Sequence, residues 1–231
     1  MLRFDVLTLF PAMFGEVLST SILKRAIQAG AMQTVLHDIR DVATDLHRTV
    51  DDTPYGGGAG MVLKVDIVDA ALQRVQALPA ITTIPVAKRR TILLCPQGQR
   101  LTQDTVRELS QFDQLTLICG HYEGYDERIR PLVDLELSIG DFVLTGGELP
   151  AMVLIDSLTR LQPGVIHAEG PGEESFTLQD AAGRTLLEYP HYTRPWEYNG
   201  STVPEVLRSG NHAAIRQWRI EQAVIRTDAR R

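Results

Sequence analysis

The chain has 231 residues, of which 44% are hydrophobic and 23% charged; this composition excludes a disordered chain and predicts a soluble protein with a hydrophobic core. No apolar run approaches the ~20 residues of a membrane helix, and Asp5 interrupts the N-terminal apolar residues, so we expect a cytoplasmic protein without a signal peptide. The net charge of −6 argues against a nucleic-acid partner, but residues 176–231 hold eight arginines against six acidic residues, and this locally basic segment is compatible with a phosphate backbone.

Three short apolar runs predict buried strands, because they are brief and end in polar or glycine residues. They cover residues 4–9, 91–95 and 115–119. Helical spacing of apolar residues predicts helices over 13–29, 65–77, 102–112 and 149–161, the third capped by Thr102 or Asp104. The last helix is expected to present Val153, Leu154, Leu158 and Leu161 on one face. This alternation predicts an α/β domain over residues 1–161 with a mainly parallel sheet.

Residues 162–175 are rich in glycine and proline and have little periodicity, which predicts a flexible linker between domains. In the second domain, residues 176–231, Pro204 begins a short helical segment and Asn211 caps a final helix. On that helix Ile215, Trp218 and Ile225 form an expected apolar seam. Four arginines follow another side and predict either a solvated basic face or an RNA contact: Arg216, Arg219, Arg226 and Arg230.

Glycine-rich segments mark the candidate binding loops. Four glycines within residues 55–60 match neither a Walker A loop nor a dinucleotide fingerprint, but they let backbone approach a flat ligand closely. The loops 96–98 and 120–128 follow two predicted strands, and ligands of open α/β sheets bind beyond the carboxyl ends of strands. The segment 138–150 carries three further glycines and lacks the cluster of basic residues that a pyrophosphate requires, which disfavours NAD and ATP.

Other chemical residues allow more than one interpretation. Glu123, Asp126 and Glu127 fit an adenosine site, the paired carboxylates of a hydrolase, or a helix start paired with Arg128 and Arg130. The two cysteines, Cys95 and Cys119, end separate apolar runs and predict buried thiols. Neither they nor the six histidines show the spacing of a transition-metal site.

Six stretches, in order along the chain, resemble the bacterial tRNA (guanine-N1)-methyltransferase family of the SPOUT class: 47–52 with 54–61, 96–98, 119–128, 138–150, 192–195 and 209–212. The resemblance implies an α/β domain with a deep trefoil knot, which connection rules alone would exclude, and a small, mostly helical C-terminal domain. It also implies a homodimer that transfers a methyl group from S-adenosyl-L-methionine (SAM) to N1 of guanine 37 in tRNA, beside the anticodon. Members of the family use Mg²⁺, for which this sequence shows no dedicated site. DNA and membranes are not expected as partners.

The resemblance assigns SAM contacts to the three knot loops and the strand ends beside them: Leu93, Leu94, Pro96, Gln97, Gly120, Tyr122, Glu123, Gly124, Ile139, Gly140, Asp141, Phe142, Val143, Leu144, Gly146, Gly147 and Pro150. We expect tRNA contacts at the glycine loop and in the C-terminal domain: Asp51, Asp52, Gly58, Gly60, Arg194, Arg216 and Arg219.

The chemistry requires a base and a cation. Guanine N1 carries a proton at neutral pH, so a carboxylate must remove it, and a guanidinium stabilises the negative charge that develops at O6. Arg160 matches the arginine of the family, and Glu174 stands where the family has an aspartate. One extra methylene displaces the carboxylate by ~1 Å, enough to cost ~100-fold in rate. The linker is one residue shorter here than is usual in the family, which would act against this displacement. Glu173 and Asp180 are the substitutes for Glu174 as base.

Three alternative functions fit parts of the sequence. Another knotted methyltransferase, acting on a ribose 2′-hydroxyl, would not need the pair formed by Arg160 and the linker carboxylate. A non-catalytic RNA-binding module would have no use for the glycine loops around SAM. A hydrolase built on Glu123 and Asp126 would leave those loops unexplained.

Overall fold

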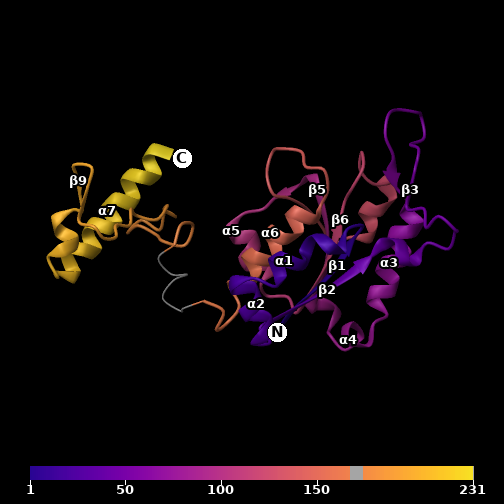
Figure 1. Ribbon diagram of the computed structural model, residues 1–231, viewed down its shortest axis with the longest axis horizontal. Coiled ribbons are helices and arrows are strands. Elements are labelled where there is room, and N and C mark those ends of the chain that lie inside the picture. Colours follow the sequence, from indigo (N-terminus) through magenta and orange to yellow (C-terminus); the bar gives the residue numbers. More distant parts are fainter. Residues whose placement is uncertain (167–173, 231) are drawn as a thin grey trace. The chain divides into compact units, whose positions relative to one another are not determined.

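The computed structural model describes residues 1–166 and 174–230. The chain forms two compact units, Met1–Ile166 and His167–Arg231 (Figure 1). The first unit is built on a five-stranded sheet in the order β2-β1-β6-β5-β7, in which every neighbouring pair is parallel. Its strands are β1 (Leu2–Thr8), β2 (Met32–Asp38), β5 (Arg89–Arg100), β6 (Gln114–Cys119) and β7 (Leu135–Ser138).

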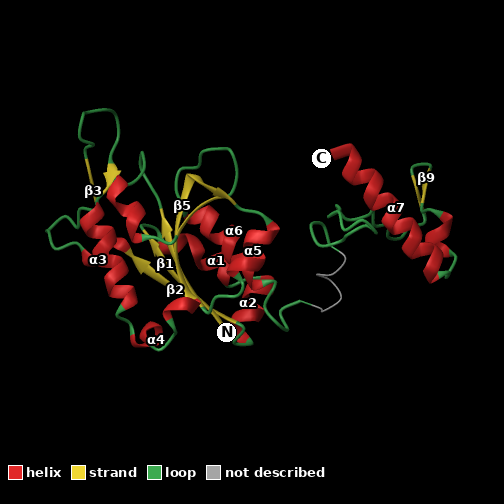
Figure 2. Ribbon diagram, turned by 180° about the vertical axis from the view of Figure 1, so that it is seen from behind, coloured by secondary structure: helices red, strands yellow, loops and turns green. Residues whose placement is uncertain are grey.

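Helices cover both faces of this sheet (Figure 2). One face packs α2 (Ser21–Gln28), α5 (Gln103–Leu109) and α6 (Glu148–Thr159), and α3 (Val65–Gln76) lies on the other. The short elements of this unit are η1 (Pro11–Phe14), α1 (Gly15–Leu18), η2 (Ile39–Val42), β3 (Asp51–Asp52), β4 (Val62–Leu63), α4 (Pro79–Thr82), η3 (Val86–Lys88) and η4 (Glu127–Leu132).

Alternation along the strands explains the two-faced packing. Side chains of a strand point to opposite faces in turn, and here Phe4 and Val6 join the core beneath α6, whereas Leu7 joins the core beneath α3. In β5, Leu94 likewise joins the core beneath α6, and its neighbour Leu93 joins the core beneath α3. Burying each such side chain contributes roughly 1.5–3 kcal/mol. The three predicted apolar strands and the parallel sheet are therefore confirmed.

Predicted helices differ from the structure in two places. The segment 13–29 is divided into η1, α1 and α2, because Thr20 is extended (φ −122°, ψ 149°) and the Ser19 hydroxyl donates to the Glu16 carbonyl at 3.3 Å. Such local side-chain bonds compete with a continuous helix. On α6, Leu154 and Leu158 are buried, but Val153 is 46% exposed and does not share their face. The cap at Thr102 is confirmed, since its hydroxyl accepts the Thr105 amide proton.

The second unit contains η5 (Glu205–Arg208), α7 (His212–Arg230) and a small hairpin of β8 (Glu197–Tyr198) and β9 (Ser201–Thr202). Asn211 caps α7 as predicted, because its side chain accepts the Ala214 amide proton at 3.1 Å. Ala223 of α7 is buried with Leu178, Leu186 and Tyr189, whereas Ile225 is 59% exposed, so the predicted seam was wrong at Ile225.

The predicted linker, 162–175, has only its two ends within the described residues. At one end the Gln162 amide donates to the Thr159 carbonyl at 3.0 Å, and Val165 packs on the core of the first unit. At the other end the Glu174 carbonyl accepts bonds from Thr177 and Leu178. Residues 167–173 lie outside the described part, so the flexible linker stays a prediction.

Strand β5 is interrupted at the segment 96–98, which was expected to be a ligand loop. The pairing of β5 with β7 shifts register between Leu94 and Gln99, so residues 95–98 bulge out of the pairing of these two strands. Gly98 lies so close to β7 that a Cβ atom there would stand 2.5 Å from the Glu136 carbonyl carbon. Because this neighbour is backbone, it cannot rotate away, and the bulge requires glycine.

We therefore predict that Gly98→Ala lowers the free energy of unfolding by roughly 1–3 kcal/mol, the usual cost of forcing an extra methylene into a packed site. The matched control is Gly15→Ala, because Gly15 is helical and a Cβ there meets no atom within 4 Å. That control should be neutral or slightly stabilising. Urea unfolding of both variants measures the difference, and equal stabilities would contradict the close packing at Gly98.

Candidate functional site

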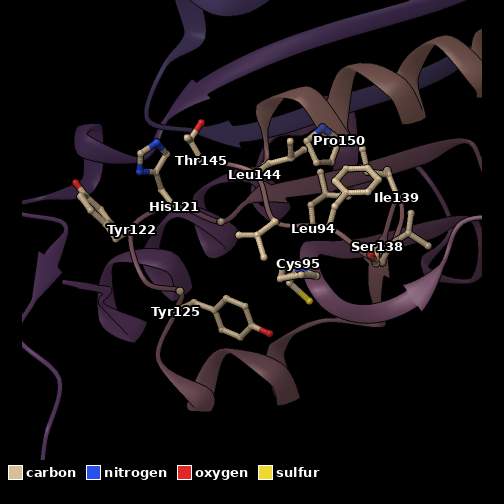
Figure 3. A pocket seen from close by; sticks show the side chains of 18 of the residues that line it. Leu94, Cys95, His121, Tyr122, Tyr125, Ser138, Ile139, Leu144, Thr145 and Pro150 are labelled. Carbon is tan, nitrogen blue, oxygen red and sulfur yellow. The ribbon is translucent and has the colours of Figure 1, made fainter. Parts of the chain in front are cut away.

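A cleft lined by several loops of the first unit lies at the carboxyl ends of β5, β6 and β7 (Figure 3). Its empty space, including the solvent at its mouth, is about 650 Å³. Three segments form its walls: the end of β5, the loop after β6 and the loop between β7 and α6. Parallel α/β sheets bind ligands at this edge.

Glycines let two of these walls touch. The Gly147 amide donates to the Gly120 carbonyl at 2.8 Å, and His121 pairs with Gly146 as an isolated antiparallel bridge. A Cβ atom at Gly147 would stand 2.6 Å from the Cys119 Cα atom. The start of α6 can therefore reach the end of β6 only because residue 147 has no side chain.

A buried carboxylate fixes the start of α6 to the end of β1. Glu148 is 2% exposed, and its Oε1 atom accepts the Thr8 hydroxyl proton at 2.7 Å. The same hydroxyl accepts the Phe10 amide proton at 2.9 Å, which orders the chain beyond β1. Burial and then the negative charge of Glu148 raise the pKa of the Cys119 thiol, so this buried cysteine stays protonated.

A second polar cluster lies behind the bulge of β5. Glu136 of β7 accepts the Tyr125 hydroxyl proton at 3.3 Å, contacts the Cys95 thiol at 3.6 Å and pairs with Arg130. Arg130 also donates to the Gln97 side chain. Burial, followed by the bond to Cys95, raises the pKa of Tyr125, which therefore remains a neutral donor. These bonds tie the bulge, β7 and the loop after β6 together.

The structure brings together most residues that we expected to contact SAM. Fourteen of them line this cleft: Leu94, Pro96, Gly120, Tyr122, Glu123, Gly124, Ile139, Gly140, Phe142, Val143, Leu144, Gly146, Gly147 and Pro150. Three do not. Leu93 is buried in the core beneath α3, Gln97 accepts from Arg130, and exposed Asp141 pairs with Arg100 at 3.2 Å. The lining also includes residues that sequence reasoning missed: Cys95, His121, Tyr125, Leu137, Ser138 and Thr145. Each of these lies in or beside a segment that the glycine pattern had marked.

The glycine loop 56–60 lies against one rim of the cleft. Its flanks pair as the antiparallel strands β3 and β4, with Asp51 opposite Leu63 and Asp52 opposite Val62. The Glu123 amide donates to the Met61 carbonyl at 3.0 Å, and a Cβ atom at Gly60 would stand 2.6 Å from the Glu123 carboxylate. Gly58 has φ +130° and is exposed. Burial and then the charge of Asp51 raise the pKa of Tyr122 at the same rim.

The acidic residues after β6 form a helix start. Asp126 caps η4, and its carboxylate bonds the Arg128 amide and guanidinium at 2.7–2.9 Å. Glu127 pairs with Arg130 at 2.5 Å. The carboxylates Asp126 and Glu127 are thus engaged by arginines, which favours the helix-start interpretation over that of a hydrolase. Among the described residues no group of three His, Cys, Asp or Glu side chains is placed to hold a metal ion.

The two expected catalytic residues belong to different units. Arg160 ends α6 in the first unit, where its amide donates to the Asp156 carbonyl at 3.1 Å. Glu174 opens the described part of the second unit. Asp180 holds a turn, since its carboxylate accepts the Ala182 and Arg184 amide protons, and the Arg184 amide is the main cause of its lowered pKa. Glu173 lies outside the described residues.

Two of the three expected arginines of the second unit line one hollow. A hollow lined by Arg216 and Arg219 also contains Tyr189, over whose ring the Arg219 guanidinium lies at 4.7 Å. Arg194 is exposed. The rings of Tyr192 and Trp218 lie tilted to each other by 53°, with their centroids 6.3 Å apart.

The fold and the cleft define an α/β protein with a candidate small-ligand site between glycine-rich loops at the carboxyl edge of a parallel sheet. The family described as tRNA (Guanine-1)-methyltransferase TrmD matches residues 2–231. A protein of Chloroflexus aurantiacus named tRNA (guanine-N(1)-)-methyltransferase is 55% identical over 100% of this chain and 87% of its own length. Proteins of the same name from Geobacillus kaustophilus and Bacillus subtilis are 52% and 51% identical over 100% of this chain and 90% of their own lengths. The chain belongs to this methyltransferase family.

Within the described ranges, 1–166 and 174–230, the structure contains no helix that combines the length and apolar character needed to cross a membrane.

The hydrogen bonds between Asp126 and Arg128 predict a lowered pKa of the Asp126 carboxyl group, which can be measured. Arg128 lowers the pKa of Asp126 to about 2, below the ~3.9 of an unfolded chain. Any stability that the ionised carboxylate contributes is therefore present above pH ~4 and is lost as the pH falls through about 2. In Arg128→Ala, carbon-detected NMR should find the Asp126 pKa raised toward ~3.9, whereas Arg107→Ala in α5 should leave it near its wild-type value. An unchanged pKa in Arg128→Ala would contradict the assigned cause.

Proposed function

We propose that this protein transfers the methyl group of SAM to N1 of guanine 37 in tRNA, beside the anticodon. Two findings support the proposal: the chain belongs to the tRNA (guanine-1)-methyltransferase family over residues 2–231, and its glycine-rich cleft has the position of a small-ligand site. The position of the cleft at the carboxyl edge of the sheet is the single structural observation on which the proposal depends.

The cleft fits SAM in its chemistry. Its described lining is largely apolar and contains no lysine or arginine, which suits an uncharged adenosine and a sulfonium better than a polyphosphate. Leu94, Ile139 and Leu144 would contact the apolar parts of the ligand, and backbone groups at Gly120 and Gly140 would approach it closely. When bound, SAM supplies an electrophilic methyl group.

The residues of this chain would prepare guanine for that transfer. Glu174 accepts the N1 proton as general base, and the Arg160 guanidinium stabilises the negative charge that develops at O6. Asp180 is a poorer base, because two backbone amides and Arg184 already occupy its carboxylate. Holding guanine N1 near the methyl group, with both residues in place, supplies much of the remaining rate enhancement.

The catalytic geometry also requires the two units to meet. We propose a homodimer in which each active site takes residues from both chains, with a trefoil knot formed around the three loops of the cleft. Residues 176–231 form the tRNA-binding domain: Arg194, Arg216 and Arg219 contact the phosphate backbone. Asp51, Asp52, Gly58 and Gly60 contact tRNA at the rim of the cleft. A tRNA-modifying enzyme of this kind works in the cytoplasm.

A Mg²⁺ ion as a second cofactor has less support than SAM. The described residues contain no cluster of three potential ligands, whereas an Mg²⁺ ion binds through oxygen atoms in octahedral geometry. The carboxylates Asp126 and Glu127 are paired with arginines. We therefore assign no step of the reaction to a metal ion.

The proposal predicts that labelled SAM methylates an unmodified tRNA transcript with G37 but not the same transcript with A37. Glu174→Gln and Arg160→Ala should each lower the rate by roughly 10²–10⁴-fold, the usual contribution of a general base or a charge-stabilising donor. Glu108→Gln, which changes an exposed carboxylate of α5, is the control and should retain the wild-type rate.

Different failures have different meanings. Methylation that survives Glu174→Gln would exclude Glu174 as base, and Glu173→Gln would then be tested. Methylation of the A37 transcript, or of a ribose hydroxyl, would contradict the proposed substrate. Binding of SAM without transfer to any tRNA would contradict enzymatic function altogether.

A further inference from the structure

His121 is a wall residue of the cleft that the mechanism does not use. It follows Gly120 directly, lines the cleft and lies beside the segment that contains Thr145 and Gly146 (Figure 3). Its imidazole is held by two aromatic rings: the Phe10 centroid lies at 5.0 Å and the Tyr122 centroid at 5.1 Å. The ring is thus fixed by packing.

The two ring nitrogens of His121 have different surroundings. The Nδ1 atom is buried and has no hydrogen-bond partner among the described residues. Folded proteins very rarely bury an N–H group without a partner, and they leave acceptor atoms unpaired more readily. The burial of Nδ1 therefore favours the neutral tautomer that carries its proton on Nε2.

Gly146 lies beside the Nε2 edge of this ring. A Cβ atom at residue 146 would press first on the Glu148 carboxylate and would stand 2.8 Å from the Cδ2 atom of His121 and 3.3 Å from Nε2. Any side chain there would crowd both the carboxylate and the ring, which glycine avoids. With this tautomer, His121 presents an N–H donor at the edge beside Gly146.

Most other side-chain donors of the lining are already engaged. The Tyr125 hydroxyl and the Cys95 thiol bond Glu136, and the Ser138 hydroxyl donates to the Gly140 carbonyl. Tyr122 bonds Asp51. In the part of the lining that the structure describes, His121 and the neighbouring Thr145 keep side-chain donors without such bonds. Of these two, the imidazole is held in place by the rings of Phe10 and Tyr122.

We propose that His121 donates a hydrogen bond from Nε2 to the carboxylate at the amino-acid end of SAM. This assignment rests on the proposed function, because it takes SAM as the ligand of the cleft. A ligand carboxylate needs a donor in a cleft whose described lining has no lysine or arginine, and bonds to charged groups are among the stronger hydrogen bonds. His121 is thus a binding residue that positions the ligand.

The test compares two ligands that differ at the amino-acid end. S-adenosylhomocysteine carries the carboxylate, and 5′-methylthioadenosine lacks the whole amino-acid end but keeps the adenosine and sulfur. Isothermal titration calorimetry gives the Kd of each, together with that of SAM, for wild type and His121→Phe. The phenylalanine preserves a ring between Phe10 and Tyr122 and removes both nitrogens.

We expect His121→Phe to weaken SAM and S-adenosylhomocysteine by about 10-fold or more, the effect of one hydrogen bond to a charged group. Binding of 5′-methylthioadenosine should change by less than about twofold, well under the effect of one hydrogen bond. His121→Asn, which restores a side-chain N–H near the ring position, should recover part of the affinity for the two ligands with a carboxylate. This pattern separates recognition of the carboxylate from a structural role of the ring.

Two results would overturn the assignment: equal weakening of all three ligands, which indicates a structural role, or unchanged affinity for SAM. If the wild-type protein bound none of the three ligands, the proposed function itself would fail. The two failures are distinguishable. The proposed function fails on the wild-type protein alone, whereas the assignment to His121 fails only when the wild type binds SAM and the variant does not show the expected selectivity.

Discussion

The backbone contact between the end of β6 and the start of α6 is the constraint on which the cleft depends. A hydrogen bond of 2.8 Å joins Gly147 to Gly120, and a Cβ atom at residue 147 would stand 2.6 Å from Cys119 Cα. Because neither partner in this contact is a flexible side chain, the distance between the two loops is set by the backbone hydrogen bond and by the van der Waals contact of backbone atoms. The loops after β6 and β7 can converge on one ligand only while residue 147 is glycine.

Buried polar bonds extend this constraint around the site. Glu148 ties the start of α6 to Thr8 at the end of β1, and Glu136 ties β7 to Tyr125 and the bulge of β5. Each carboxylate is expensive to bury alone, so removing either partner would leave an unpaired group in the protein. The first unit therefore offers a preorganised ligand cleft, which is the condition for catalysis by positioning. The base that we propose, Glu174, belongs to the second unit.

The sequence predicted the parts of the fold that depend on local pattern. Short apolar runs located β1, β5 and β6, and capping residues located the starts of α5 and α7. It did not locate β2, because the edge strand Met32–Asp38 is mostly half-buried and polar and has no apolar run. The loops of the cleft could be predicted from glycines and strand ends, but the surroundings of the Nε2 edge of His121 could not. They depend on the distance to Gly146, a residue 25 positions away that only the folded sheet brings close.

The central claim is that the cleft at the carboxyl edge of the sheet binds SAM, and the most direct measurement is a crystal structure with S-adenosylhomocysteine. The account predicts electron density between the loop 120–124 and the loop 139–147, with the adenosine enclosed by Leu94, Ile139 and Leu144. Well-defined ligand density outside this cleft, with the cleft itself filled only by solvent, would contradict the account.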